Sequence, residues 1–374
     1  MGLATHRSDE LNLAAEHVNH VPKNTFFQRF RTSVVWNKIV HWEFWPFWLV
    51  YSPMFFYWTW ITLRTRSFFF FTAANQGMEF GGLLGGSKYK ILKSIPAEYL
   101  PKTYPFPSNV SMDSFLKKIT KEGLNFPIIL KPDIGERGFM VELIKCEEML
   151  KNYLDQIKVD FMVQEYVTFP VELGVFYYRF PDQKKGTVSS VTLKELLSVE
   201  GDGIRNVEEL MHESVRAKMH IKELKVKEEK LLSYRPEKNE IVEIVSIGNH
   251  CRGTKFINGN HLINDQLIDV FDRISQKIVG FQYGRYDLRC MSLEDLYVGK
   301  NIKILELNGA GAEPAHIYHP GNSILHGYRD IIFHLSVLKD ISLINHKNGI
   351  PYLSFWPGVK ELWKIWKYAR LKAS

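Results

Sequence analysis

Cysteine is scarce in this sequence, and the few cysteines present are poorly placed for a structural role. The 374 residues contain three of them, Cys146, Cys251 and Cys290, which are widely spaced and odd in number. This pattern gives no disulfide framework and no metal-ligand spacing. The simplest interpretation is a reduced protein whose functional part faces the cytoplasm.

Two kinds of segment are also missing. Residues 1–23 are polar and weakly patterned, without the short apolar core and small-residue cleavage site of a secretory signal. The net charge is +7, yet no basic run is interleaved with stacking aromatics, so we expect no nucleic-acid partner. Because the basic residues flank apolar aromatic segments instead, anionic lipid is the better candidate.

Aromatic residues, by contrast, are abundant. Phe, Tyr and Trp make up 14% of the chain, and six of the nine tryptophans lie between Trp36 and Trp60. The uncharged stretch 45–63 is nineteen residues long, near the minimum of roughly 17–20 for a membrane span. Pro46 and Pro53 interrupt it, and tryptophan prefers the membrane interface to the bilayer centre, which favours shallow insertion.

Positive charges flank this stretch on both sides. Arg29 and Lys38 precede it, and Arg64 and Arg66 follow it, so the positive-inside rule places both ends on one side of a membrane. We therefore expect a re-entrant or monotopic segment that bends back near Pro53 on the cytoplasmic face. An ordinary pair of aromatic core helices is the alternative.

The stretch with the clearest chemistry lies further along the chain. Residues 283–290 alternate in polarity and residues 302–307 are apolar and branched, which predicts two strands joined by a turn. Side chains two apart on a strand share a face, so polar groups gather on one surface of this pair. These groups are Arg285, Asp287, Arg289, Glu306 and Asn308.

Carboxylate and amide oxygens in such an arrangement suit Mg²⁺, which takes one or two carboxylates and completes its coordination with water and nucleotide phosphates. Asp287, Glu306 and Asn308 are therefore candidate metal ligands. Ordinary surface ion pairs on a strand pair are the alternative interpretation.

In the order of its motifs the sequence resembles the ATP-grasp superfamily, most closely its D-alanine-D-alanine-ligase-like, carboxylate–amine ligase branch. The resemblance rests on Arg285-x-Asp287 followed by Glu306-x-Asn308, and it covers roughly residues 87–335. It implies an α+β fold in which two lobes clasp ATP. It also implies that Asp287, Glu306 and Asn308 hold the Mg²⁺ ions that bridge the ATP phosphates.

The resemblance assigns the phosphate contacts mainly to lysines. Lys90 matches the first ATP-contacting lysine by spacing, with Lys88 and Lys93 as open alternatives. Lys131, at the end of the apolar strand NFPIILKP, matches the lysine that meets the α- and β-phosphates.

A glycine-containing turn follows Lys131 and would close over the phosphates with its backbone N–H groups. Arg137 and Gly138 are its candidate nucleotide contacts. Family members usually have small residues where this chain has Glu136 and Arg137, so the turn departs from the family pattern.

The adenosine contacts are implied by the next apolar strand, in FMVQEYV. Glu165, Tyr166 and Val167 match the hinge whose backbone pairs with the adenine edge. Glu172 matches the ribose-binding carboxylate, with a surface charge on an edge strand as the alternative. Lys194 matches a further lysine that faces ATP.

Catalysis in this scheme is electrostatic. Lys131, Arg252 and Arg285 would offset the negative charge that builds up in the transition state, and His250 would be at best auxiliary. Polar groups at the mouth of the site follow the second metal strand: Glu313, His316, Tyr318 and His319. Of these, His316 or Tyr318 is expected to contact the acceptor.

The chain is thus expected to have four parts. An N-terminal arm and aromatic membrane-associating segment (1–86) precedes a first ATP-grasp lobe (87–165) and a second lobe with the Mg²⁺/ATP site (166–340). A basic amphipathic helix (341–374) ends the chain, either as an interfacial anchor or packed on the protein's own core.

These expectations predict a membrane-associated, ADP-forming ligase that makes a C–N bond through an acyl phosphate. The aromatic block stands where D-alanine-D-alanine ligases have a separate N-terminal domain, which favours a lipid-like or membrane-borne carboxylate and an amine acceptor. Two alternatives remain: a kinase-like phosphotransferase of the same fold, and a non-catalytic nucleotide-binding membrane protein.

Overall fold

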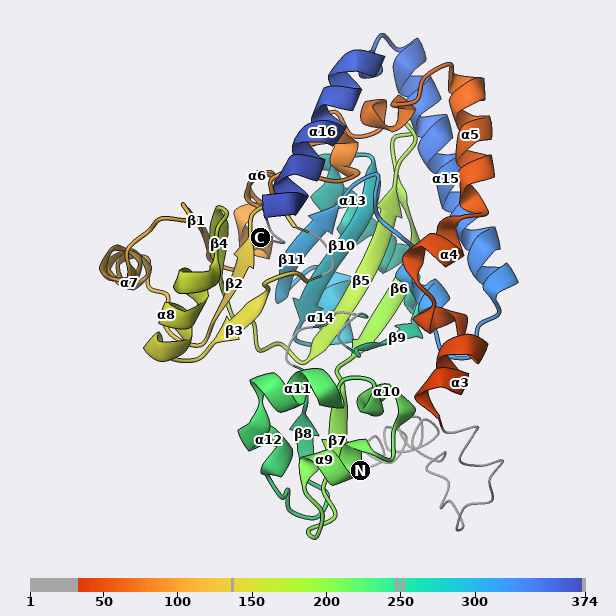
Figure 1. Ribbon diagram of the computed structural model, residues 1–374. Coiled ribbons are helices and arrows are strands. Elements are labelled where there is room, and N and C mark those ends of the chain that lie inside the picture. Colours follow the sequence, from red (N-terminus) through yellow and green to blue (C-terminus); the bar gives the residue numbers. More distant parts are fainter. Residues whose placement is uncertain (1–32, 136–137, 246–247, 249, 251–252, 372–374) are drawn as a thin grey trace, which may run out of the picture.

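Two antiparallel sheets form the two lobes of the protein (Figure 1), whose computed structural model describes residues 33–135, 138–245, 248, 250 and 253–371. The smaller sheet has four strands in the order β1-β4-β2-β3. Helices α7 and α8 bury their apolar side chains, including Phe115 and Leu150, in the same core as the sheet. The elements of this lobe are β1 (Thr103–Phe106), α7 (Met112–Lys121), β2 (Ile128–Pro132), β3 (Glu142–Ile144), α8 (Glu147–Gln156) and β4 (Phe161–Glu165).

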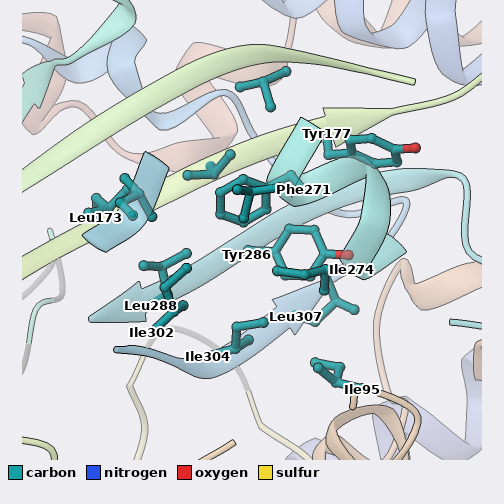
Figure 2. Packing of buried hydrophobic residues seen from close by; sticks show 14 of the residues in the cluster. Ile95, Leu173, Tyr177, Phe271, Ile274, Tyr286, Leu288, Ile302, Ile304 and Leu307 are labelled. Atoms are coloured by element: carbon teal, nitrogen blue, oxygen red, sulfur yellow. The ribbon is translucent and has the colours of Figure 1, made fainter. Parts of the chain in front are cut away.

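The larger sheet has five strands in the order β11-β10-β5-β6-β9. One face packs on the amphipathic helix α13, so that Leu173, Tyr286, Leu288 and Phe271 share a core (Figure 2). The elements are β5 (Val171–Tyr178), β6 (Thr187–Glu195), β9 (Lys255–Asn258), η6 (Asn260–Leu262), α13 (Asp265–Gln276), β10 (Tyr283–Cys290), α14 (Leu293–Val298) and β11 (Ile302–Asn308). The predicted α+β class is confirmed.

The pairing of β10 with β11 brings together the two polar faces that the alternation predicts. Arg285 lies opposite Asn308 and Asp287 lies opposite Glu306, with an irregularity between Asp287 and Leu288. The predicted simple turn between the strands is wrong, because α14 forms there. Its N-cap Ser292 accepts a hydrogen bond from the backbone of the third helical residue, and a left-handed glycine ends the helix.

A small subdomain extends from the second lobe between β6 and β9. Its short helices and strand pair bury a hydrophobic cluster of their own that includes Val207, Met211, Ala217 and Leu232. Its elements are β7 (Ser198–Glu200), α9 (Val207–Met211), α10 (Val215–Lys218), α11 (Ile221–Lys227), α12 (Glu229–Ser233) and β8 (Ile241–Glu243).

The aromatic N-terminal segment follows one side of the long helix α15 (Ile324–Lys347) (Figure 1). It consists of α3 (Val34–Val40), η1 (Trp42–Phe44), α4 (Phe47–Tyr51) and α5 (Met54–Thr65). The predicted reversal at Pro53 is wrong. Ser52 and Pro53 both have right-handed helical dihedrals, and proline is tolerated in the first turn of a helix, so α4 leads into α5 without folding back.

Helix α5 has two different faces. Met54 and Ile61 are buried against the protein, whereas Phe55, Phe56 and Leu63 are 67%, 77% and 73% exposed. Among the described residues, no helix combines the length and the apolar character that crossing a membrane requires.

A glycine-rich loop ties this segment to the strand β11. The N–H groups of Ala310 and Gly311 donate to the carbonyls of Gly81 and Gly82 at 3.0 and 3.1 Å. Gly82 has a φ of +72°, and a Cβ there would lie 2.8 Å from the Cα of Gly309, so the close approach requires glycine. The loop includes η2 (Phe70–Ala73) and η3 (Glu79–Gly82), and α6 (Lys88–Lys93) and η4 (Ala97–Tyr99) follow it.

The last two helices differ from the predicted division at residue 340, because α15 continues without interruption to Lys347. After it comes α16 (Phe355–Leu371). Val359 and Leu362 pack on the cluster around α5 and α15, and Tyr368 packs on the first lobe. Trp356, Trp363 and Trp366 are 50–77% exposed, so α16 packs on the protein and also presents tryptophans to solvent.

Candidate functional site

A cavity of about 770 Å³ lies between the two sheets and is closed on one side by the N-terminal segment. At its charged end it is lined by Lys131, Lys194, Arg285, Asp287, Glu306 and Asn308. At its aromatic end it is lined by Trp45, Phe47, Val50 and Tyr318. The structure therefore brings the two predicted metal strands, the predicted phosphate lysine and the aromatic block around one space.

Asp287 is the centre of the charged end. Its Oδ2 accepts hydrogen bonds from Arg285 Nη2 and Asn308 Nδ2, each at 3.0 Å. Its Oδ1 lies 3.0 Å from Lys194 Nζ, but it is buried and receives no well-aligned hydrogen bond among the described residues. Burial raises the pKa of this carboxyl, but the neighbouring Arg285 and Lys194 more than offset that effect and hold the pKa well below the usual range.

The donor set at this end suits Mg²⁺. Asp287 Oδ1 is a buried acceptor without a well-aligned donor, and Glu306, which pairs with Lys88, lies opposite Asp287 in the strand register. Asn308 donates through Nδ2 to Asp287 Oδ2, so its amide oxygen would join the set once the side-chain amide turns over. These three oxygen donors on adjacent strands fit a hard, six-coordinate cation that keeps some of its water.

Lys131 stands at the end of β2, with its ammonium group buried between the lobes. It donates to Gln164 Oε1 and to the backbone carbonyl of Leu305, each at 3.0 Å. Burial, with a contribution from nearby Lys88, lowers its pKa to about 7, although Asp287 acts in the opposite direction. A phosphate beside this group would restore its positive charge.

The structure distinguishes between the three lysines of α6. Lys88 lines the cavity and forms an ion pair with Glu306. Lys90 lies outside the cavity, 72% exposed, and pairs with Glu79 at 2.6 Å. Lys90 thus occupies a different side of the short helix from Lys88, and Lys93 lies over the Tyr89 ring, outside the cavity lining. Lys88 is the member of the set that faces the site.

The predicted hinge, Glu165, Tyr166 and Val167, also lines the cavity. The carbonyl of Val167 accepts a hydrogen bond from Arg289 Nη1 at 2.8 Å, and the N–H of Glu165 donates to the carbonyl of Lys102 at 2.8 Å. Part of the hinge backbone is thus already engaged by the protein itself.

Glu172 belongs to a charged network that the sequence interpretation did not include. Arg289 Nη2 lies 2.8 Å from its Oε2, and Lys194 Nζ lies 3.4 Å from its Oε1. Lys194 connects this network to Asp287. Arg289 was recognisable from its position on the same strand face as Arg285 and Asp287, but no ligand role followed from that position alone.

Two predicted contacts, Arg137 and Arg252, lie outside the described residues. Gly138, which follows the first of them, lines the cavity, as does His250. The ring of His250 lies 5.1 Å from that of Tyr318, and its Nε2 lies 3.6 Å from Glu43 Oε2. His250 therefore belongs to the aromatic end of the cavity.

The predicted mouth residues divide into two pairs. Glu313 and Tyr318 line the cavity, and the Tyr318 hydroxyl donates to Glu313 Oε2 at 3.1 Å. His316, predicted as a possible acceptor contact, is instead buried outside the cavity, bonded to Ser190 Oγ at 2.7 Å and to Asp330 Oδ2 at 3.0 Å. His319 accepts a hydrogen bond from the backbone of β9 at 3.2 Å, so both histidines have structural positions.

Residues of the N-terminal segment also reach this end of the cavity, which the sequence interpretation missed. Glu43 forms an ion pair with Arg216 at 2.5 Å. Tyr51 lies near Glu313 and Tyr318. Burial, followed by the Glu313 carboxylate, raises the pKa of both tyrosines well above the usual range, so both hydroxyls keep their protons at neutral pH.

No family model and no curated protein sequence matches this chain. Among solved structures, it is similar to a bifunctional glutathione synthetase from Pasteurella multocida, with 17% identity, a TM-score of 0.33, and coverage of 66% of this chain and 35% of the other. It is also similar to the VanG D-Ala:D-Ser ligase from Enterococcus faecalis, with 12% identity, a TM-score of 0.40, and coverage of 71% and 62%.

A third match is the D-alanine-D-alanine ligase from Coxiella burnetii, with 8% identity, a TM-score of 0.40, and coverage of 73% of this chain and 61% of the other. The chain thus spans about a third of the length of the first of these structures and about three fifths of the other two.

Proposed function

We propose that this protein is an ATP-dependent carboxylate–amine ligase of the ATP-grasp type that works at a membrane surface. The supporting observation is the charged end of the cavity. Lysine and arginine side chains from both lobes face one acidic strand pair there, with Lys131 on β2 and Lys194, Arg285 and Asp287 on the second sheet. A site of this kind matches a polyphosphate with its divalent cation, because positive groups and metal-binding oxygens surround the same space.

The residues present fit Mg²⁺, and Asp287, Glu306 and Asn308 would hold it. When bound, the ion would neutralise part of the charge on the ATP phosphates. Lys88 now pairs with Glu306, so nucleotide binding would release this lysine toward the phosphates. Lys131 would place a second positive charge between the lobes, where burial strengthens each electrostatic contact.

The reaction that this arrangement supports is phosphoryl transfer from ATP to a carboxylate, followed by attack of an amine on the acyl phosphate. The residues contribute charge and position rather than a covalent intermediate. Arg285 is fixed by Asp287 and by the backbone carbonyl of Glu313, to which Nη1 donates at 2.9 Å. It is therefore directed toward the junction of the charged and aromatic ends, where the carboxylate would be held.

The membrane part of the proposal rests on exposed aromatic residues. Phe55 and Phe56 on α5 point away from the protein, and Trp356 and Trp363 on α16 are also exposed. Basic residues accompany these tryptophans, and the guanidinium of Arg370 lies 3.7 Å from the centre of the Trp366 ring. Such surfaces favour the interface of an anionic bilayer, and they are consistent with a lipid-like substrate and a location at the cytoplasmic face.

The test is release of ADP and phosphate by the purified full chain with Mg-ATP, with and without a total lipid extract. A ligase releases phosphate only when carboxylate and amine are both present, whereas a phosphotransferase retains the phosphate on its product. Mass spectrometry of the lipid fraction would identify a new amide.

The matched variants are Glu306→Gln and Lys90→Gln. We expect the first to lower turnover about a hundredfold or more, because one metal-binding carboxylate is lost, and the second to leave turnover unchanged because Lys90 lies outside the cavity. Equal activity of Glu306→Gln and the wild-type protein would refute the metal assignment.

A further inference from the structure

A second cavity adjoins the aromatic end of the site. It has a volume of about 300 Å³ and shares Phe47, Leu83 and Glu313 with the main cavity. We call it the side pocket and define it by the residues that its three helices contribute most directly: Phe47, Tyr51, Met54, Trp58, Ile331 and Leu335. Nearly all of this lining is apolar, and it comes from α4, α5 and α15.

Polar groups gather where the side pocket meets the main cavity; His334 also lines the pocket, but both of its ring nitrogens are bonded, to Ser189 Oγ and to the carbonyl of Asp330. Glu313 lines both spaces, and its Oε2 accepts the Tyr318 hydroxyl. Tyr51 Oη lies near the same carboxylate, is buried, and receives no well-aligned partner among the described residues. A carboxylate flanked by two protonated tyrosines therefore marks the junction.

The charge at this junction decides which kind of head group it accepts. The Glu313 carboxylate attracts an ammonium group and repels a carboxylate. Glu313 is half-buried and Arg285 lies close to it, so water and this guanidinium weaken the effect without changing its sign. Tyr51 and Tyr318 can orient the head group further by hydrogen bonds. The carboxylate substrate would be held on the other side of this junction, where Arg285 and Lys131 supply positive charge.

The opposite end of the side pocket reaches the exposed aromatic surface. Phe55 lines the pocket and is also 67% exposed, on the outward face of α5. An apolar chain could therefore pass from a lipid surface into the pocket without crossing a charged region. This continuity explains why aromatic helices, rather than a polar loop, cover the site.

We propose that the side pocket is the subsite for the amine substrate of the ligase, and that this substrate is an amphiphilic primary amine whose apolar chain fills the pocket. The inference rests on the proposed function. The ammonium group lies at Glu313 and faces the carboxylate that is activated at the charged end.

The reaction balances without a further reagent. The ammonium group gives one proton to Glu313, and from there to solvent. The neutral amine attacks the acyl carbon, the C–N bond forms, and the bond from that carbon to the phosphate oxygen breaks. Phosphate leaves with the second proton of the nitrogen. Glu313 thus binds the amine and takes up its proton.

The first test is calorimetric titration of the full chain, without ATP, with hexylamine, octylamine and decylamine below their micellar concentrations, and with the matching carboxylates. We expect each added methylene to tighten amine binding about fourfold until the pocket is filled. We also expect octylamine to bind at least tenfold more tightly than octanoate. Affinity that is independent of chain length, or octanoate binding as tightly as octylamine, would overturn the proposal.

Three variants locate the binding. Leu335→Trp fills the pocket and should weaken octylamine binding at least tenfold, whereas Ile332→Trp, on the exposed side of the same helix, should not change it. Glu313→Gln should abolish the preference for octylamine over octanoate while leaving the dependence on chain length. If Leu335→Trp keeps its native melting transition and wild-type octylamine affinity, the amines bind elsewhere and the proposal is wrong.

The binding test separates this inference from the proposed function. If amines bind with an affinity that depends on chain length but the protein never releases ADP, the ligase proposal is wrong and the assignment of the side pocket as an amine site stands. ADP and phosphate release by a protein that binds none of the amines would leave the ligase and remove the pocket assignment.

Discussion

The two ends of the cavity are built in opposite ways. The charged end is formed by strands of two sheets, and its side chains hold one another through ion pairs such as those that Asp287 makes with Arg285 and Lys194. The aromatic end is formed by short helices that come from outside both sheets and pack on α15. Hydrogen-bonded strands hold their side chains in a fixed register, whereas the short helices are held mainly by apolar packing. The chemistry should therefore depend on the first end, and the choice of substrate on the second.

The largest effect is expected at Asp287, on the charged side of the comparison. The substitution Asp287→Asn keeps the size of the side chain but removes the charge that two buried cations share. We expect turnover to fall about a thousandfold, together with a loss of about 3 kcal/mol or more in unfolding free energy, because Arg285 and Lys194 are left without their carboxylate. Steady-state kinetics and urea denaturation measure the two effects.

On the aromatic side of the protein, an equally disruptive substitution should lower the unfolding free energy rather than the turnover. Phe70 is fully buried, and its ring centre lies 4.9 Å from that of Trp58 on α5. Phe70→Ala should lower the unfolding free energy by about 3–5 kcal/mol through the cavity that it leaves. Denaturant unfolding measures this loss. A fall of less than about 1 kcal/mol would show that the N-terminal segment is not part of the cooperative core.

At Lys131, also on the charged side, the affinity for ATP should depend on pH. Its pKa in the protein without ligand is lowered to about 7, and bound phosphates would raise it, so ATP binding takes up a proton above that pH. We expect ATP affinity to be highest at and below about pH 7 and to fall by up to tenfold for each pH unit above it.

Titration calorimetry at constant free Mg²⁺, in two buffers of different ionisation enthalpy, would detect the proton uptake. Lys131→Met should remove this dependence. An affinity that remained constant from pH 7 to pH 9 in the wild-type protein would contradict the assignment of Lys131 to the phosphates.

The smallest effect should come from the outward face of the aromatic segment. Phe56 is 77% exposed, so Phe56→Ser should leave the unfolding free energy within about 0.5 kcal/mol of the wild-type value. Partition onto anionic vesicles should nevertheless weaken several-fold, which vesicle sedimentation measures. If a variant that also lacks Phe55 partitioned onto vesicles like the wild-type protein, this face would not be the membrane contact.

The sequence was most informative for the strands, whose side chains alternate between two faces. Alternation predicts that Arg285 and Asp287 share one face of a strand and that Glu306 and Asn308 share one face of the next. The structure pairs these two sets directly, in a register that alternation alone does not specify. The short helix α14 was missed although Ser292, an acidic first turn and Gly299 are the usual signals of a helix start and end. Its six residues were too few for periodicity to show.

Other parts of the site depend on tertiary contacts that no local pattern contains. Lys88 and Lys90 lie on one turn of a short helix, and only packing on β11 decides which one meets Glu306. Pro53 was interpreted as the bend of a hairpin because basic residues flank the segment on both sides, but it stands at the N-cap of α5 with helical dihedrals, so the chain continues without folding back. The contribution of Tyr51 required knowing that α4 lies beside Glu313.

The helix α16 touches both lobes, through Leu362 on one side and Tyr368 on the other. A change in the distance between the two sheets must therefore shift, tilt or bend this helix. Its exposed tryptophans take part in any such movement. If they rest on a bilayer, that surface would restrain the helix and, through it, the separation of the two sheets.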